Sequence, residues 1–310
     1  MKVTLFLPAL AGVAGRTTGL GTLALAAEDA GFWGVAFSEH PAPSRKWLDG
    51  GGHDSYDPML ALAYCAAVTS TIRLIPCVSV LPYRNPLLSA KSIATLDILS
   101  GGRLTLIVGA GYLRSEFRAL GVEFEDRNEL LDEAIDVLRR LWLNDSFEYR
   151  GKHFTAIGQV SSPPPVQRPH PPIWIGGNSL RARQKAALVA SGWAPMQLDA
   201  MGAATARTRP MHTVSEVADA VADLRRLLDV EGRAADAFDI QLQAPAADFA
   251  NPQLSMPERQ EILRQLANAG VTHVLAFLPH GDQETLLKFI ERDGSQFAQE
   301  LATWLPGRSE

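Results

Sequence analysis

Two side chains that can hold or move a proton, Glu39 and His40, come just after an apolar run that ends at residue 37, with Ser38 between. Imidazole titrates near neutral pH, so a histidine can act as an acid, a base or an oriented hydrogen-bond donor. His40 is therefore the candidate catalytic residue, with a histidine that only holds its loop as the alternative. Glu39 points the other way in an extended chain, so we expect it to orient neighbouring groups rather than react.

A second candidate segment ends the apolar run at residues 72–78 and leads into a turn bounded by Pro82 and Pro86. Such a segment could place backbone against a flat ligand, although proline-rich turns are common. The residues concerned are Val78, Ser79 and Val80.

Two glycines, Gly109 and Gly111, follow the apolar run at residues 104–108. Glycine lets the backbone approach a ligand closely, so both are candidate binding residues. They match part of the dinucleotide-binding fingerprint, but Arg114 stands where its third glycine would be. We therefore reject a Rossmann-type site.

A candidate anion site follows the apolar run at residues 173–175, where two glycines lead into a helical pattern. Free amides at a helix start attract anions, and a phosphate is the obvious ligand. The alternative is a plain loop in which a polar side chain caps the helix. The residues are Gly176, Gly177, Asn178 and Ser179.

Composition excludes several other functions. The histidines are scattered with no pair at ligand spacing, so no metal site is predicted, and no GxSxG elbow is present. The net charge of −5 comes without a basic cluster, which argues against nucleic acid as a partner. No apolar run is long enough to span a membrane, and Pro8 interrupts the only run resembling a secretory signal. With two cysteines in 310 residues, we expect a cytoplasmic protein with buried thiols.

Apolar runs alternate with helical patterns along the whole chain, which predicts parallel strands joined by crossover helices. Eight such units in about 300 residues predict a (β/α)8 TIM barrel, with a doubly wound open sheet as the main rival. We expect a single domain over residues 1–310, although two compact domains would also fit the length. An irregular insertion is predicted at residues 144–172 and a mouth loop at 197–213. The predicted strands are residues 3–7, 33–37, 72–78, 104–108, 173–175, 193–195, 239–243 and 271–277.

The ordered set of short motifs resembles the luciferase-like monooxygenase superfamily, and in particular its branch of probable coenzyme F420-dependent oxidoreductases. The resemblance extends from about residue 1 to residue 300 and is densest between residues 33 and 195. The motifs are Glu39-His40, Asp57-Pro58, the segments 81–86 and 99–104, Gly111-Tyr112, Glu116-Phe117, 119–122 and 168–178.

The resemblance implies a barrel that holds a tricyclic ring at the strand ends, with coenzyme F420 as the expected cofactor and FMN as the alternative. His40 matches the position that faces the reactive edge of the ring. A non-prolyl cis peptide, expected at Ser79–Val80, would back the ring, and the Gly176–Ser179 amides would bind the cofactor phosphate. Tyr112 stands where related sugar dehydrogenases carry Glu, which disfavours a sugar-phosphate substrate. The family also implies a homodimer that acts on a small organic molecule.

Three functions follow from this resemblance. The leading hypothesis is an F420-dependent oxidoreductase that moves a hydride to or from a small organic substrate. The first alternative is an FMNH2-dependent monooxygenase that uses O2. The second is a barrel that binds a flavin-like cofactor without turnover.

Overall fold

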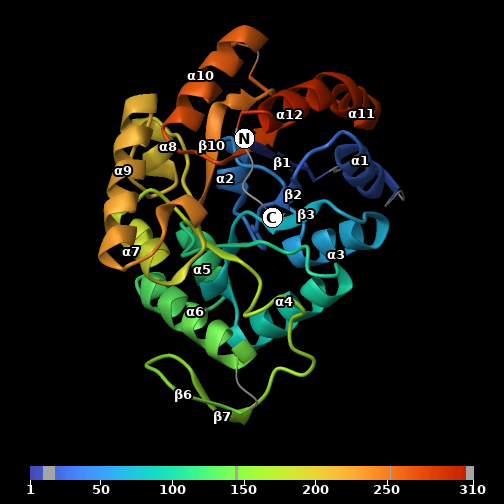
Figure 1. The fold of residues 1–310 in the computed structure, drawn as a ribbon. Coiled ribbons are helices and arrows are strands. Elements are labelled where there is room, and N and C mark those ends of the chain that lie inside the picture. The colour runs from blue at the N-terminus through green and yellow to red at the C-terminus, as the bar shows by residue number, and fades with distance from the viewer. Residues whose placement is uncertain (10–17, 144–145, 252, 305–310) are drawn as a thin grey trace. The chain divides into compact units, whose positions relative to one another are not determined.

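The computed structural model describes residues 1–9, 18–143, 146–251 and 253–304, and its chain forms two compact units (Figure 1). Unit 1 comprises Met1–Ala36, Thr71–Arg73 and Ile173–Glu310, and unit 2 comprises Phe37–Ser70 and Leu74–Pro172. The first two residues of the predicted insertion, 144 and 145, lie outside the described residues.

Unit 1 is built on parallel strands that neighbour one another in the order β2-β1-β11-β10-β9-β8. Strands β2 and β11 are apolar and almost entirely buried, as expected of parallel strands that are covered on both faces. The elements are β1 Lys2–Phe6, α1 Thr18–Asp29, β2 Gly34–Phe37, β8 Ile173–Gly176, α7 Leu180–Val189, β9 Gly192–Ala194, α8 Ala200–Thr205, α9 Val214–Val230, η2 Ala235–Ala237, β10 Asp239–Asp248, α10 Met256–Asn268, β11 His273–Phe277, α11 Gln283–Phe289, the π-helical turn η3 Ile290–Gly294 and α12 Ser295–Ala302.

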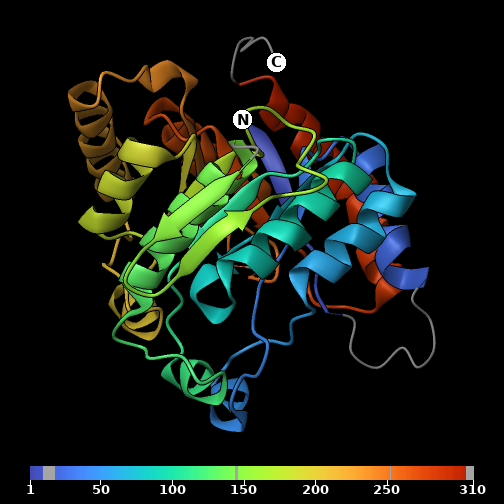
Figure 2. The ribbon, with the colours of Figure 1, turned by 90° about the horizontal axis from the view of Figure 1, so that it is seen from below.

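Unit 2 combines short strands with longer helices, of which α3 and α4 pack side by side (Figures 1 and 2). Strand β4 pairs in parallel with β5, while β6 and β7 form an antiparallel hairpin. The elements are α2 Arg45–Asp49, α3 Pro58–Val68, β3 Arg73–Pro76, β4 Ser79–Val80, η1 Leu81–Tyr83, α4 Pro86–Leu99, β5 Leu106–Gly109, α5 Arg114–Ala119, α6 Arg127–Leu143, β6 Phe147–Arg150 and β7 Thr155–Gln159.

Most predicted elements are confirmed, and local chemistry explains their ends. Asp57 caps α3 by accepting the amides of Met59 and Leu60, and Pro58 occupies the first turn. The apolar stripe predicted on α6 is buried along its length. The hairpin predicted inside residues 144–172 is also present, as β6 and β7.

The segment predicted to be a mouth loop, residues 197–213, contains the short helix α8, which the sequence analysis did not predict. Asp199 accepts the amide of Gly202 at 2.8 Å and so caps this alanine-rich helix. An antiparallel bridge also joins Leu198 and Met211. The sequence does contain the capping aspartate and the alanines, but the polar residues around them obscure the helical pattern.

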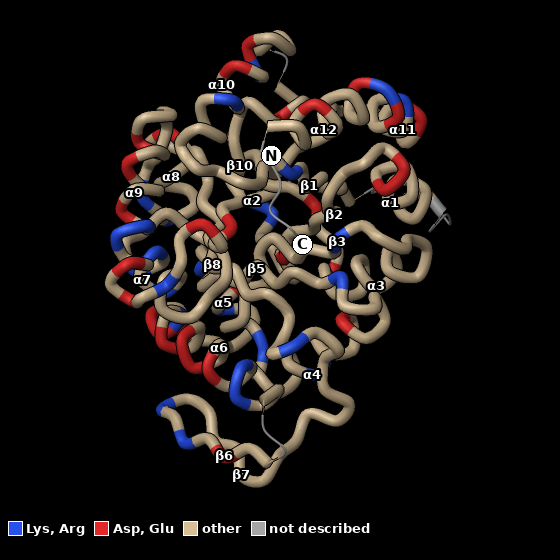
Figure 3. Tube along the Cα trace, in the orientation of Figure 1, with Lys and Arg blue, Asp and Glu red and all other residues tan. Residues whose placement is uncertain are grey.

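The helices carry charge of both signs, as expected from a composition without a basic cluster. Both signs of charge occur along α9 and α11 rather than in separate patches (Figure 3). Among the described residues, no helix is both long and apolar enough to cross a membrane.

Candidate active site

The candidate catalytic residue His40 lies in unit 2, three residues beyond the end of β2. Its Nδ1 lies 3.1 Å from Oε2 of Glu116, a residue on α5 that is completely buried. A carboxylate only accepts hydrogen bonds, so this contact makes Nδ1 of His40 the donor. The other ring nitrogen, Nε2, is thereby left as the atom that can take up or release a proton.

Glu116 also accepts hydrogen bonds from two other groups. The Tyr83 hydroxyl donates to Oε2 at 2.8 Å, and the Ala42 amide donates to Oε1 at 3.2 Å. Burial, together with the negative charge of Glu116, raises the pKa of Tyr83 well above its usual range. Tyr83 therefore stays protonated near neutral pH and can donate its hydrogen bond to the carboxylate.

Aromatic rings surround the imidazole of His40, and its side chain is 8% exposed. The Trp47 ring lies 4.6 Å away between centroids, and the rings of His53 and Tyr112 approach edge-on at 5.2 and 5.8 Å. Burial, with a smaller contribution from Glu116, raises the pKa of Tyr112 to about 12. These neighbours present neutral, mainly apolar surface to whatever binds beside His40.

Glu39 lies beside the turn at residues 78–80 and is 5% exposed. Its Oε2 accepts the Val80 amide at 2.7 Å and the Ser79 hydroxyl at 3.3 Å. Its Oε1 pairs with Arg84 at 2.8 Å, and the same Arg84 nitrogen contacts Asp57 at 2.7 Å. Burial raises the pKa of Glu39, while Arg84 and the Val80 amide act in the opposite direction. These contacts are those of a side chain that orients its neighbours.

The non-prolyl cis peptide lies at Cys77–Val78, not at Ser79–Val80. The predicted position is therefore wrong by two bonds. Ser79 and Val80 instead form β4, an extended pair in register with Val108 and Gly109 of β5.

The side chains of Val78 and Val80, in this same turn, leave little room for a Cβ at Gly109 or Gly111. A Cβ on Gly109 would lie 3.0 Å from the Val78 side chain, and one on Gly111 would lie 2.7 Å from that of Val80. Gly111 also has a φ of +78°, which favours glycine. Val78 and Val80 therefore lie against these two glycines, and the approach of a ligand there remains a prediction.

The predicted anion site lies in unit 1, at the start of α7. Ser179 caps this helix by accepting the Ala182 amide at 3.1 Å. The Asn178 amide donates to the Thr208 hydroxyl at 3.0 Å, and the Gly177 amide donates to Ala194 O at 3.2 Å. Two of the predicted amides therefore already have protein partners, and helix capping, the alternative for this segment, is present.

The Asn178 side chain ties the same segment to the residues that follow β9. Its amide nitrogen donates to the carbonyls of Met196 and Arg209 at 2.7 and 2.9 Å, while its oxygen accepts the Met196 amide at 2.9 Å. With 2% of its surface exposed, Asn178 holds the loop by its side chain.

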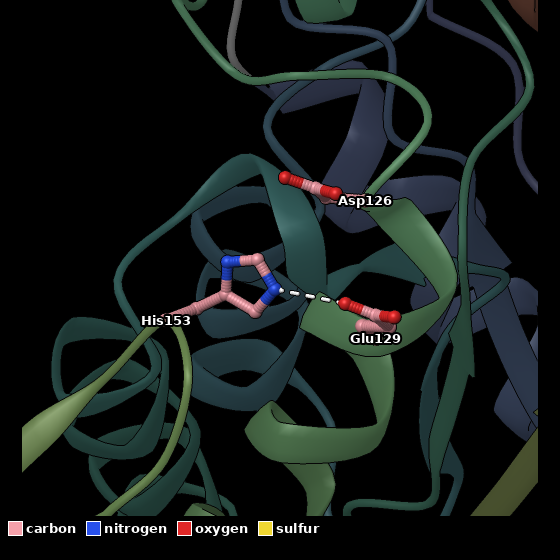
Figure 4. A group of neighbouring side chains, drawn as sticks. All are labelled: Asp126, Glu129 and His153. Carbon is pink, nitrogen blue, oxygen red and sulfur yellow. Dashed lines mark hydrogen bonds and ion pairs between the residues drawn. The ribbon is translucent and has the colours of Figure 1, made fainter.

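One cluster of potential metal ligands occurs among the described residues, in unit 2 (Figure 4). Asp126 and Glu129 come from the start of α6, and His153 comes from the loop between β6 and β7. Glu129 already accepts Lys152 Nζ at 2.6 Å and lies 3.3 Å from His153 Nε2. The ammonium group neutralises this carboxylate, so Glu129 already has a cationic partner within the chain.

Sequence reasoning missed the roles of Glu116, Tyr83 and Arg84. All three lie within the motifs that carry the family resemblance, and that was their only signal. Their partners are far away in sequence: 76 residues separate Glu116 from His40, and 45 separate Arg84 from Glu39.

The profile of the luciferase-like monooxygenase family matches residues 1–276. The chain is 33% identical over 175 residues to an FMNH2-dependent dimethylsulfone monooxygenase of Pseudomonas putida, covering 55% of this chain and 46% of that protein. It spans about half the length of the curated relatives that it matches.

Solved structures show the same fold at lower identity. A monooxygenase of Streptomyces bottropensis has a TM-score of 0.73 at 21% identity, covering 98% of this chain and 99% of that chain. The coenzyme F420-dependent tetrahydromethanopterin reductase of Methanopyrus kandleri has a TM-score of 0.70 at 18% identity, covering 94% and 97%. The predicted luciferase-like TIM-barrel fold is therefore confirmed, and the chain belongs to the luciferase-like monooxygenase family.

Proposed function

We propose that this protein is an oxidoreductase that transfers a hydride between coenzyme F420 and a small organic substrate, with His40 exchanging the accompanying proton. The observation that carries the proposal is the His40–Glu116 contact of 3.1 Å. It leaves Nε2 of His40 as a base when a substrate hydroxyl is oxidised and, once protonated, as an acid when a carbonyl is reduced. The bound deazaflavin would supply or accept the hydride.

The residues present fit such a cofactor. Around His40 they offer neutral rings, and the buried carboxylates of Glu39 and Glu116 are fully engaged by donors of this chain. In unit 1, a Cβ on Gly177 would meet only the Ala182 Cβ, at 3.9 Å, and Gly177 has a φ of +105°. For an anion to bind this loop, the Gly177 and Asn178 amides would have to exchange Ala194 O and the Thr208 hydroxyl for the ligand.

The chain's own residues account for the proton in this reaction. When a secondary alcohol is oxidised, its O–H proton would pass to Nε2 of His40 as the hydride leaves the carbon, which balances charge and electrons. Glu116 stabilises the resulting imidazolium. We include a homodimer and a cytoplasmic location in the proposal, and sedimentation of the purified protein tests the former.

The test is binding of coenzyme F420 and FMN to the same purified protein, followed by fluorescence and native mass spectrometry. We expect F420 to bind more tightly, and His40→Gln to abolish turnover while leaving F420 binding within a few-fold. Tight FMN binding without deazaflavin binding would overturn the proposal. Cofactor analogues that lack the phosphate distinguish the contact at His40 from the contact at the Gly176–Ser179 loop. If that loop binds phosphate, Thr208→Val should weaken binding of the phosphorylated cofactor but not of the analogue.

A second candidate is an FMNH2-dependent monooxygenase, favoured by the 33% identity to the Pseudomonas putida enzyme. Deazaflavin has carbon in place of N5, the ring nitrogen that a flavin needs to form a hydroperoxide with O2. Rapid O2 consumption with FMNH2, and none with reduced F420, would favour this alternative.

A further inference from the structure

Glu116 combines complete burial with three hydrogen-bond donors of this chain. Oε2 accepts from His40 Nδ1 and the Tyr83 hydroxyl, and Oε1 accepts from the Ala42 amide. Phe117, the next residue on α5, is also fully buried and packs edge-on against the Tyr83 ring at 4.9 Å. The carboxylate is therefore held in place from several sides.

We propose that Glu116 is a positioning residue that holds neutral His40 in the tautomer with its proton on Nδ1, so that Nε2 always faces the reaction as the free base. The consequence for turnover rests on the proposed function. The tautomer itself is a property of the protein alone and can be measured without any cofactor.

The number of donors explains why this position requires a carboxylate. Ionised glutamate accepts at both oxygens and donates nothing, which matches the three donors from His40, Tyr83 and Ala42. Glutamine would have one oxygen and one NH2 group. If its oxygen kept the Ala42 amide, its NH2 would face His40, whose Nδ1 would then have to accept. The opposite orientation would leave the Ala42 amide facing another donor, which is unfavourable.

The other groups around His40 do not fix its tautomer in this way. Trp47 and Tyr112 contact it through ring faces and edges, and the His40 amide donates to Ser55 Oγ at 3.3 Å without involving the imidazole. His53 approaches edge-on, but its own Nε2 lies 2.9 Å from Ser38 Oγ. Glu116 thus provides the contact that decides which of the two ring nitrogens carries the proton.

The direct test is nitrogen NMR of protein labelled with [15N]histidine, at a pH above the titration range of imidazole. His40→Asn assigns the signals. In the wild type we expect the shift pattern of a single Nδ1–H tautomer. In Glu116→Gln we expect that pattern to give way to the Nε2–H form or to a mixture. Unchanged His40 shifts in Glu116→Gln would overturn the proposal.

Two matched variants distinguish the loss of positioning by Glu116 from a general disruption of the structure. Tyr83→Phe removes one donor but keeps the carboxylate, so the Nδ1–H pattern should persist. Glu125→Gln changes an exposed carboxylate that pairs with Arg114 at 2.6 Å, and it should leave both the shifts and the melting temperature unchanged. Loss of the Nδ1–H pattern in Tyr83→Phe would show that the phenol, not Glu116, controls His40, and would also overturn the proposal.

Kinetics then connect the tautomer to function. With F420, Glu116→Gln should lower kcat by roughly 10²-fold or more, in line with tautomer loss in other histidine–carboxylate pairs, with little change in cofactor affinity. A protein that shows the Nδ1–H pattern but no F420 turnover would refute the proposed function and leave the role of Glu116 intact. Normal kcat in a Glu116→Gln variant with an altered tautomer would refute the catalytic consequence.

Discussion

The backbone amide of Val80 donates to the carboxylate of Glu39 across 2.7 Å, although 41 residues separate them in the chain. Arg84, at the far end of the same turn, pairs with the other oxygen of that carboxylate at 2.8 Å. One buried side chain thus holds Val80 and Arg84, the residues that flank η1. The turn proposed to face the cofactor is positioned by Glu39, the residue beside His40.

Replacing Glu39 with Gln should therefore destabilise the protein. The change removes the charge that compensates Arg84 and one acceptor of the Ser79–Val80 pair, and buried hydrogen bonds to a charged group contribute about 1.5–3 kcal/mol in general. We expect a loss of that size in the free energy of unfolding, measured by urea denaturation. Glu125→Gln, whose side chain is 63% exposed, should change it by less than about 1 kcal/mol. Equal losses in the two variants would contradict the role of Glu39.

The sequence predicted the positions of Glu39 and His40 because both follow a strand, and strand ends in this fold are identifiable from hydrophobic pattern alone. It did not predict the function of Glu116. Its helix, α5, has six residues and too little periodicity to be recognised. The contact that gives Glu116 its role also depends on tertiary structure that local patterns do not encode.

A similar limit applies to the glycines. The sequence indicated Gly109 and Gly111 as positions where a ligand could approach the backbone, and this remains a prediction. It did not indicate that the Val78 and Val80 side chains lie against these glycines, because that contact depends on how β4 pairs with β5. The cis bond lies at Cys77–Val78, a detail that the motif match alone did not resolve.

Gly111→Ala provides a direct test of this packing. The new methyl group would meet the Val80 side chain at 2.7 Å and the Phe117 ring at 3.0 Å, at a residue with φ +78°. Gly121→Ala is the matched control, because Gly121 has a φ of +71° but nothing within 4 Å of its added Cβ. Both variants should lose the roughly 1–2 kcal/mol that a left-handed conformation costs an alanine.

Gly111→Ala should lose about 1–3 kcal/mol more than Gly121→Ala, the usual penalty for overpacking. Urea denaturation of both variants measures the difference. Adding Val80→Ala to Gly111→Ala should recover part of the loss, so that the double-mutant cycle gives a favourable coupling energy. Strictly additive effects would mean that the Val80 contact does not limit this position.

His53 should make the folded state less stable in mild acid. Burial, with a smaller contribution from the charge of His40, lowers the pKa of His53 from its ordinary value of 6.5 to about 4. Between these two values the unfolded chain binds more protons than the folded chain, so stability rises with pH through this range and is lost as pH falls. His53 is exposed by surface area, and solvent screening should keep the effect well below the full value for such a shift.

Urea denaturation from about pH 4 to pH 7 tests this dependence. His53→Gln should flatten the slope of stability against pH below about pH 6.5, and the variant should be relatively more stable than the wild type at the acidic end. The exposed residue His212, in unit 1, provides the control variant His212→Gln, which should follow the wild-type slope. Parallel curves for the wild type and His53→Gln would refute the prediction.

The two cysteines should be unreactive in the native protein. Cys65 is completely buried on α3, and Cys77 precedes the cis bond and is half-buried; burial raises the pKa of each thiol to about 12. Because the thiolate is the reactive form, only about one part in 10⁴ of each thiol would be available to react near pH 8.

We expect a disulfide reagent such as DTNB to titrate less than one thiol over an hour without denaturant and both thiols in guanidinium. Cys77→Ala separates the two sites, because any slow native reaction should disappear with the more exposed thiol. Rapid reaction of one full equivalent in the native state would mean that Cys77 is accessible and that its thiolate is stabilised.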